Sequence, residues 1–321
     1  MLILLPPEFN GLSQYWKRFG GMCRWLVARP KLSRYGKRYR TQYDDLRPDH
    51  IGFAWQLQRH INLKGKSVLE IGGSNYPAEI LFDDLRAAKW TCVDYLQYWE
   101  ELNDGTNPAA AVGDTADKSG SRSFPLEEAE INFNAHRYCK FSGNAADIPD
   151  YFTEKFDVAS SLCCFEHVHQ LDKVIENIYR SLRPGGTFCT FFGPIWSGPL
   201  GHHYWLNKRT NFNHIGGDRI PPFTHLLYSE EEIRRYCERL VLPHGNKQLE
   251  ALCHWSYHTD KLNHLFYEDY AALMERSPFS HWSIVPYWRH YISRKTMAEL
   301  RSRYPGYKRF DVSGIFIEAV K

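Results

Sequence analysis

A glycine pair and an acid placed one predicted strand later form the first pattern that suggests chemistry. Gly72 and Gly73 follow an apolar run, and Asp94 lies 24 residues after Glu70. A glycine loop after a strand lets the backbone approach a ligand closely, and an acid at the end of the next strand can accept both ribose hydroxyls. The motif G-x-G-x-x-G is absent, so the pattern does not indicate a dinucleotide.

Two adjacent histidines form a second candidate group. His202 and His203 lie in an aromatic, Gly-Pro-rich segment, residues 193–205. Imidazole is the side chain best suited to accept a proton near neutral pH. We therefore predict His203 or His202 as the general base for a hydroxyl acceptor; the alternative is that both only tie the loop to the core. A stacking platform for the acceptor is predicted from three aromatic residues of the same segment: Trp196, Tyr204 and Trp205.

The other histidines and the cysteines give weaker signals. His254 and His258 are spaced to share a helix face, but no glutamate completes an H-E-x-x-H motif. The pair Glu166-His167 is interpreted as structural support. The eight cysteines show no C-x-x-C spacing, which favours reduced, buried thiols. We predict no metal site.

Strands and helices must bring these residues to one place. Strands are predicted over residues 67–71, 90–93, 138–141, 156–162, 187–192 and 310–320, and helices over 77–85, 171–182 and 229–240. This alternation predicts an α/β fold with a Rossmann-like, doubly wound, mostly parallel sheet. In such a sheet the ligand crevice lies outside the carboxyl ends of the strands. The loop at 193–205 is expected at that edge.

Five short blocks, in order along the chain, carry a family resemblance. They are Glu70-Ile71-Gly72-Gly73 with Asp94, Gly143-Asn144-Ala145-Ala146-Asp147-Ile148-Pro149, Phe156-Asp157-Val158, Phe165-Glu166-His167-Val168 and Leu182-Arg183-Pro184-Gly185-Gly186. The ordered series resembles the class I S-adenosylmethionine-dependent methyltransferases, and residues 310–320 resemble the last strand of that fold. The resemblance implies a seven-stranded sheet and S-adenosylmethionine as cofactor.

The resemblance also implies roles for individual residues. Glu70 would position the amino-acid end of the cofactor through the glycine loop, and Asp94 would bind the ribose. Ser161 and Leu162 would offer backbone carbonyls to the methionine ammonium. The cofactor-binding residues implied in this way are Glu70, Gly72, Gly73, Asp94, Asn144, Ala145, Ser161 and Leu162.

The adenine end departs from the family pattern. Asn144 would hydrogen-bond the adenine amino group where the family usually has an acid, and the backbone of Ala145 would meet the ring. Ser74 and Tyr76 replace later glycines of the first loop. These departures leave open a catalytically degenerate scaffold that only binds the cofactor.

The segments after the fifth strand resemble those of bacterial methyltransferases that modify sugars and cell-surface polysaccharides. Aromatic rings among polar groups suit sugars, whose faces are apolar and whose rims carry hydroxyls. Our first choice of activity is therefore O-methylation of a sugar or glycan-precursor hydroxyl, in polysaccharide biosynthesis. The alternative acceptor is a small-molecule amine or phenol.

Composition and charge add expectations about location. The hydrophobic share of 43% is typical of soluble chains, and no apolar run approaches the roughly 18 residues that span a bilayer. We predict a cytoplasmic protein. Residues 9–43 hold nine Lys and Arg, no acid and several aromatics. This basic arm predicts peripheral contact with an anionic membrane or glycan carrier, with a merely solvated basic face as the alternative. Nucleic acid is less favoured, because no nucleic-acid module accompanies the arm.

The predicted organisation has four regions. Residues 1–50 form the basic aromatic arm, and residues 51–200 form the methyltransferase core, with an insertion or flexible loop at about 103–137. Residues 201–290 form the substrate-side loop and an inserted helical cap. Residues 291–321 end the core and include the last strand.

Overall fold

The computed structural model of this chain describes residues 52–54, 57–58, 61–73, 76–95, 121–204, 220–238 and 246–321. The predicted basic arm, the first half of the predicted insertion, Ser74 and Trp205 lie outside the described residues. The chain divides into two units, residues 1–62 and 63–321. Every element described below belongs to the second unit. The division into four regions stays a prediction.

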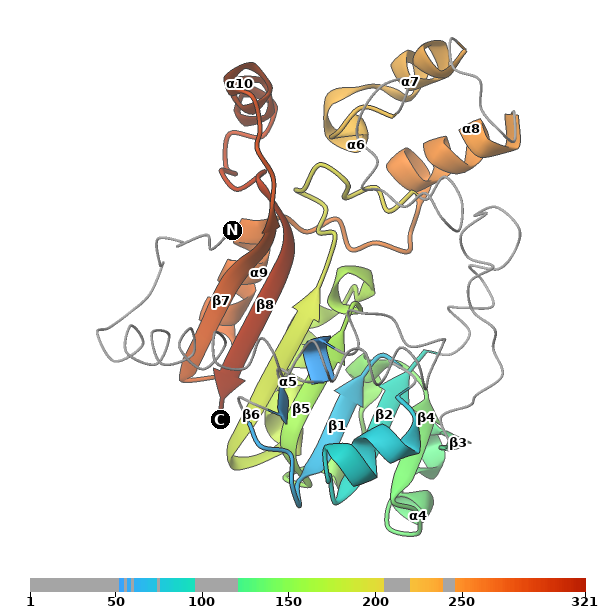
Figure 1. The fold of residues 1–321 in the computed structure, drawn as a ribbon, viewed down its shortest axis with the longest axis vertical. Helices are drawn as coiled ribbons and strands as arrows, with labels where there is room; N and C mark the ends of the chain where they lie inside the picture. Colours follow the sequence, from blue (N-terminus) through green and yellow to red (C-terminus); the bar gives the residue numbers. More distant parts are fainter. Residues whose placement is uncertain are drawn as a thin grey trace. The chain divides into compact units, whose positions relative to one another are not determined.

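A mostly parallel sheet of eight strands forms the centre of this unit (Figure 1). Its order is β3-β4-β2-β1-β5-β6-β8-β7. The strands up to β6 pair in parallel, whereas β8 is antiparallel to β6, and β7 to β8. The bounds are β1 Ser67–Ile71, β2 Lys89–Asp94, β3 Arg122–Pro125, β4 Tyr138–Ser142, β5 Phe156–Leu162, β6 Leu182–Phe192, β7 His281–Arg289 and β8 Val312–Val320.

The predicted count of seven strands is wrong by one. The additional strand, β3, lies in the predicted insertion at 103–137 and pairs with β4 at the edge of the sheet. Its sequence is largely exposed and ends in Pro125, which an edge strand tolerates. The short helices that follow, η3 Leu126–Glu128 and α4 Ala129–Asn132, bury Leu126 and Ala129 in the core. The elements β3, η3 and α4 therefore form packed structure within the predicted insertion.

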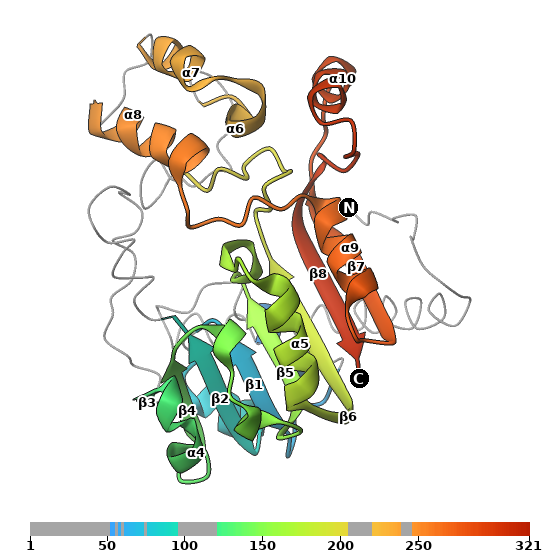
Figure 2. The same ribbon diagram turned by 180° about the vertical axis from the view of Figure 1, so that it is seen from behind.

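Helices cover both faces of the sheet. On one face lie α5 Leu171–Ser181 and α9 Tyr267–Arg276 (Figure 2). The apolar sides of both helices are buried in the same core cluster as the strands. On the other face, η1 Ile80–Asp84, coloured teal in Figure 1, buries Ile80 and Leu81. This arrangement matches the predicted Rossmann-like fold.

Further helices lie beyond the carboxyl ends of the parallel strands (Figure 1). They are α6 Thr224–Leu227, α7 Glu230–Cys237, α8 Asn246–Cys253, η7 His254–His258 and α10 Arg294–Arg303. The capping box of Ser229 and Glu232 starts α7 at the predicted position. Toward the end of the predicted loop and cap at 201–290, α9 packs in the same core cluster as the strands, and β7 is an edge strand of the sheet. The strand β7 was not predicted, because its sequence mixes polar and apolar residues and many of them are exposed.

No helix in the described residues is long and apolar enough to cross a bilayer. The seven cysteines among those residues are unpaired thiols, five of them buried.

Candidate functional site

The carboxyl ends of the parallel strands bring most of the predicted cofactor residues to one edge. Ile71, the last residue of β1, pairs with Val93 of β2 and with Ser161 of β5. Asp94 ends β2 beside Ser142 of β4. The glycine loop, Asp94, the segment after β4 and the end of β5 are therefore neighbours. This is the edge where ligands bind in open α/β sheets.

Gly72 begins the loop in a left-handed conformation, with φ of 78°. Its N–H donates to the Val93 carbonyl at 2.9 Å, which continues the β1–β2 pairing by one residue. A Cβ atom at this position would lie 2.6 Å from the Cys164 sulfur. The loop passes this close to the segment after β5 only because residue 72 has no side chain.

Asp94 lies directly beside the glycine loop. Burial raises the pKa of its carboxyl, and hydrogen bonds from the backbone of Gly73 and Tyr95 and the charge of Lys140 oppose that rise. The hydrogen bond from Gly73 orients the carboxylate at the strand end. The carboxylate is thus placed to accept hydrogen bonds from the hydroxyls of a ligand that lies over the glycine loop.

Glu70 lies inside the protein, beneath the edge that carries the glycine loop and Asp94. Its carboxylate is buried and accepts a 2.8 Å hydrogen bond from the Trp90 indole N–H. Ser161 has a similar role in the neighbouring strand β5, since its hydroxyl donates to the Ile71 carbonyl at 2.8 Å. Leu162 is buried at the end of β5. These contacts tie the end of β1 to the start of β2 and to the end of β5.

The segment predicted to meet adenine is held by its own turn and by α5. The Asn144 side chain accepts from the Ala146 N–H at 2.9 Å and caps η4 Ala145–Asp147. The buried amide of Asn177 donates to the carbonyls of Ala145 and Ala146, at 3.1 and 2.8 Å. The amide oxygen of Asn144 is therefore already engaged in a cap, and its contact with an adenine amino group stays a prediction.

The loop after β6 folds back over the end of the sheet. The N–H of Gly193 donates to the Glu166 carboxylate at 3.0 Å. Further along, a Cβ atom on Gly201 would collide with the backbone of Trp196, so the loop closes on itself only with glycine there. His203 follows in a left-handed conformation, with φ of 52°, and its Nδ1 lies 2.8 Å from the Gly201 carbonyl oxygen.

The two predicted bases differ in their surroundings. His202 is buried, and its Nδ1 accepts the Tyr204 N–H at 3.0 Å. Burial, together with the nearby His225 and His203, holds the pKa of His202 well below its usual range. Because the hydrogen bond occupies the lone pair that a base needs, the geometry favours His203 over His202.

The predicted stacking platform is not assembled as expected. Tyr204 is only 2% exposed and packs with Ile233 and Trp255, so its assignment as a platform is corrected to a core residue. The reason is that the loop folds inward. Trp196 is half-buried and lies between two imidazoles, with ring centroids 4.4 Å from His225 and 4.1 Å from His264.

A cluster that the sequence did not predict lies where the β5 and β6 loops meet. Glu166 and His167, from η6 Phe165–His167, meet His203 so that one ligand atom of each lies within 4.8 Å of the others. His203 Nε2 lies 4.0 Å from Glu166 Oε1. Burial alone would raise the pKa of Glu166, but the imidazoles of His203 and His167 lower it overall. Because the two histidines are 36 positions apart, no local spacing could reveal this cluster.

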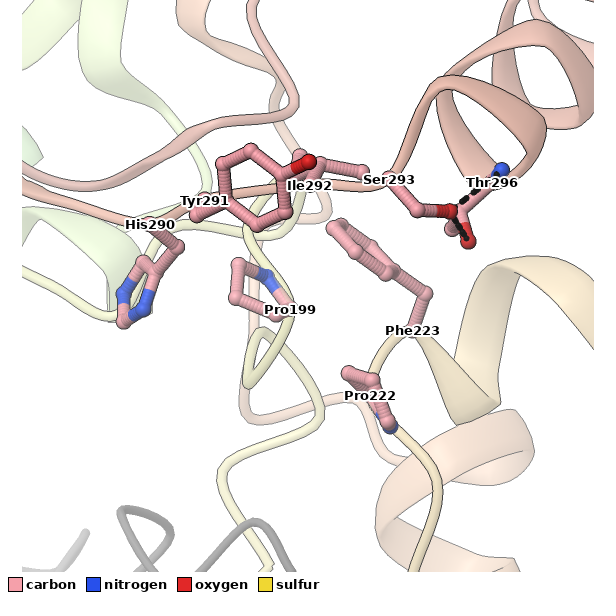
Figure 3. Close-up of a pocket in the computed structure, with 8 residues that line it drawn as sticks. All are labelled: Pro199, Pro222, Phe223, His290, Tyr291, Ile292, Ser293 and Thr296. Atoms are coloured by element: carbon pink, nitrogen blue, oxygen red, sulfur yellow. Dashed lines mark hydrogen bonds between the residues drawn. The ribbon is translucent and has the colours of Figure 1, made fainter.

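A pocket of about 180 Å³ lies farther along the same loop (Figure 3). The residues that line it are Pro199, Pro222, Phe223, His290, Tyr291, Ile292, Ser293 and Thr296. Its walls are mostly apolar rings, and the Ser293 hydroxyl, bonded to Thr296, stands at one end (Figure 3). None of these residues was predicted, since they come from three distant segments.

Comparison with known proteins agrees with this geometry. Residues 124–190 match the family model described as a methyltransferase domain. This stretch runs from β3 to β6 and includes Asn144, Ala145, Ser161 and Glu166. The match supports S-adenosylmethionine-dependent methyl transfer, with S-adenosylmethionine as the cofactor. No curated protein matches the chain.

Two solved structures are among those that match this chain. One is phosphoethanolamine N-methyltransferase 2 of Haemonchus contortus with S-adenosyl-L-methionine, at 15% identity, 84% of this chain, 52% of that chain and a TM-score of 0.41. The other is an S-adenosylmethionine-dependent methyltransferase from Mesorhizobium loti, at 12% identity, 83% and 97% coverage and a TM-score of 0.43. This chain thus spans about half of the first protein and nearly all of the second.

Proposed function

We propose that this protein is an S-adenosylmethionine-dependent O-methyltransferase that acts on a hydroxyl of a sugar or glycan precursor. The observation that carries the proposal is the meeting of the cofactor edge with the Glu166, His167 and His203 cluster. Glu166 follows the end of β5 by four residues and is bonded to Gly193 at the end of β6. Groups that can act on an acceptor therefore stand beside the predicted cofactor position.

The residues of this chain have two tasks in such a reaction. When bound, S-adenosylmethionine supplies an electrophilic methyl group on its sulfonium sulfur. Gly72, Asp94 and the segment held by Asn177 would fix the position of that group, which matters because methyl transfer is an in-line displacement. His203, whose buried Nε2 lies 4.0 Å from Glu166 Oε1, would accept the proton of an acceptor hydroxyl brought to it, as the new O–C bond forms and the S–C bond breaks.

Two features support a sugar as the acceptor. The loop after β6 and the pocket beside it combine aromatic rings with hydroxyl and imidazole groups, including Phe223, Tyr291, His290 and Ser293. Such surfaces suit a ring with apolar faces and a polar rim. The pocket, at about 180 Å³, is smaller than most ligand sites, so it would take a small group such as part of one sugar ring. An amine acceptor that arrives neutral would need no help from His203.

The test is transfer of labelled methyl groups from S-adenosylmethionine to a panel of sugars and sugar nucleotides, with phenols and amines as competitors. We expect labelled sugar ethers, and a fall in turnover of about 10²-fold or more for His203→Ala with cofactor affinity kept. The matched control is His169→Ala, an exposed histidine two residues after His167. Methylation of amines alone, unaffected by His203→Ala, would contradict the sugar proposal. Cofactor binding without any transfer would favour the scaffold alternative.

A further inference from the structure

We infer that Glu166, His167 and His203 form a binding site for one divalent transition-metal ion of the Zn²⁺ or Mn²⁺ class. Two imidazoles and one carboxylate are a common ligand set for such ions. The inference rests on the proposed function only for the role of the ion, because the site itself is read from contacts within the protein. It would replace the prediction that the chain has no metal site.

The hydrogen bonds of the two histidines fix which ring nitrogen faces the centre. Nδ1 of His167 lies 2.9 Å from the Lys261 carbonyl oxygen, and Nδ1 of His203 lies 2.8 Å from that of Gly201. A carbonyl oxygen only accepts, so each Nδ1 carries a hydrogen, and in the neutral imidazole Nε2 is then the acceptor nitrogen. Histidines that bind metals are held in this way by a second-layer carbonyl.

The carboxylate supplies an independent observation. Glu166 is 3% exposed. Its Oε1 accepts the Gly193 N–H, while Oε2 is fully buried and has no hydrogen-bond partner among the described residues. A buried carboxylate oxygen without a partner is costly, and a cation at the centre of the cluster would satisfy it.

The spacing of the ligand atoms is close to that of a bound state. With bonds of about 2.1 Å, the ligands of a tetrahedral ion lie roughly 3.4 Å apart. Here Nε2 of His203 and Oε1 of Glu166 are 4.0 Å apart, and one possible ligand atom of each of the three residues lies within 4.8 Å of the other two. Small rotations of the three side chains would shorten these distances and close the site around an ion. Three protein ligands leave a position for an oxygen of the acceptor.

The backbone around the cluster is held on both sides. The Asn263 N–H donates to the Glu166 carbonyl at 3.0 Å, and its side-chain amide donates to the carbonyls of Phe165 and Val168. Tyr270 in turn donates to the Asn263 oxygen at 3.0 Å. The short helix that carries two of the three ligands is therefore fixed before any ion binds.

An ion at this site would act in the proposed reaction by binding the acceptor oxygen. It would lower the pKa of the hydroxyl, whose proton then passes to solvent, and the oxygen electron pair would form the new bond to the methyl carbon as the S–C bond breaks. His203 would then act as a ligand and not as the base itself.

The experiment is a titration of the full-length, chelator-treated protein with Co²⁺, followed by its visible absorption, and with Zn²⁺ by calorimetry. We expect one equivalent per chain and visible bands typical of bound Co²⁺. Glu166→Gln and His203→Ala should each weaken binding by at least tenfold, whereas His169→Ala should bind like the wild type. Circular dichroism of each variant checks that it is folded.

Three results would overturn the site: no binding by the wild type, binding by His203→Ala equal to that of the wild type, or the same loss for His169→Ala. Because the titration needs no cofactor, it is separate from the proposed function. Metal binding without methyl transfer would keep the site and reject the function. Full methyl transfer in the presence of chelator, still dependent on His203, would reject the role of the ion and leave His203 as the base.

Discussion

Gly72 is a residue of the cofactor edge at which an added side chain would collide with its surroundings. We expect Gly72→Ala to lower the free energy of unfolding by about 1–3 kcal/mol, because it combines backbone strain with a collision against Cys164. Gly65→Ala is the matched control, since Gly65 has a similar φ of 73° but nothing within 4 Å of its would-be Cβ. Urea denaturation of both variants measures the difference. Equal losses would mean that the contact with Cys164 has no energetic weight.

The types and spacing of residues predicted where they lie in the fold better than they predicted which other residues they contact. Gly72, Asp94 and Ser161 lie at the strand ends where their spacing placed them, because each directly follows or ends an apolar run. His202 and Tyr204 could not be assigned in this way. Tyr204 is buried by the path of the loop after β6 and by α7, α8 and η7, which pack against it from far along the chain, and His202 lies against His225 of α6.

The link between α5 and the short helix η4 holds the segment that is predicted to bind adenine. Asn177→Ala removes the amide that serves two carbonyls, at Ala145 and Ala146. We expect a loss of stability of about 1–3 kcal/mol and weaker cofactor binding, since two buried acceptors lose their donor. Thermal unfolding and cofactor calorimetry measure the two effects.

A control for this prediction lies on the same helix. Lys173 pairs with Asp147 across the same gap at 2.9 Å, but both side chains are more than half exposed. Lys173→Ala should therefore change stability by no more than about 1 kcal/mol. If the two variants lose the same stability, the buried amide is not what holds η4 on α5.

Helices and strands were predictable from the sequence where one hydrophobic pattern, that of a helix or that of a buried strand, dominated. The strands β1, β4 and β5 and the helix α5 were predicted within about a residue of their observed bounds, because buried parallel strands are rich in apolar residues and α5 has a clear apolar side. The edge strands β3 and β7 were missed. Each is exposed along much of its length and carries a proline, so its sequence resembles a loop.

For the molecule as a whole, the basic arm at residues 9–43 is the feature that the proposed site does not use. We propose that it binds an anionic surface. Replacing Arg34, Lys37, Arg38 and Arg40 by Gln in the full chain should weaken binding to vesicles that contain phosphatidylserine, with turnover on a small soluble acceptor unchanged. Sedimentation of the protein with these vesicles at low and high salt measures the binding. Binding that does not fall with salt would contradict an electrostatic arm.

The account depends most on the claim that the carboxyl edge of the sheet binds S-adenosylmethionine through Asp94. Calorimetric titration of the full-length protein with S-adenosylmethionine tests this claim directly. We predict saturable binding by the wild type and a loss of about 1.5–3 kcal/mol for Asp94→Ala, as for a hydrogen bond to a charged group. NAD should not compete. No binding by the wild type, an affinity unchanged by Asp94→Ala, or tight binding of NAD at the same site would contradict the account.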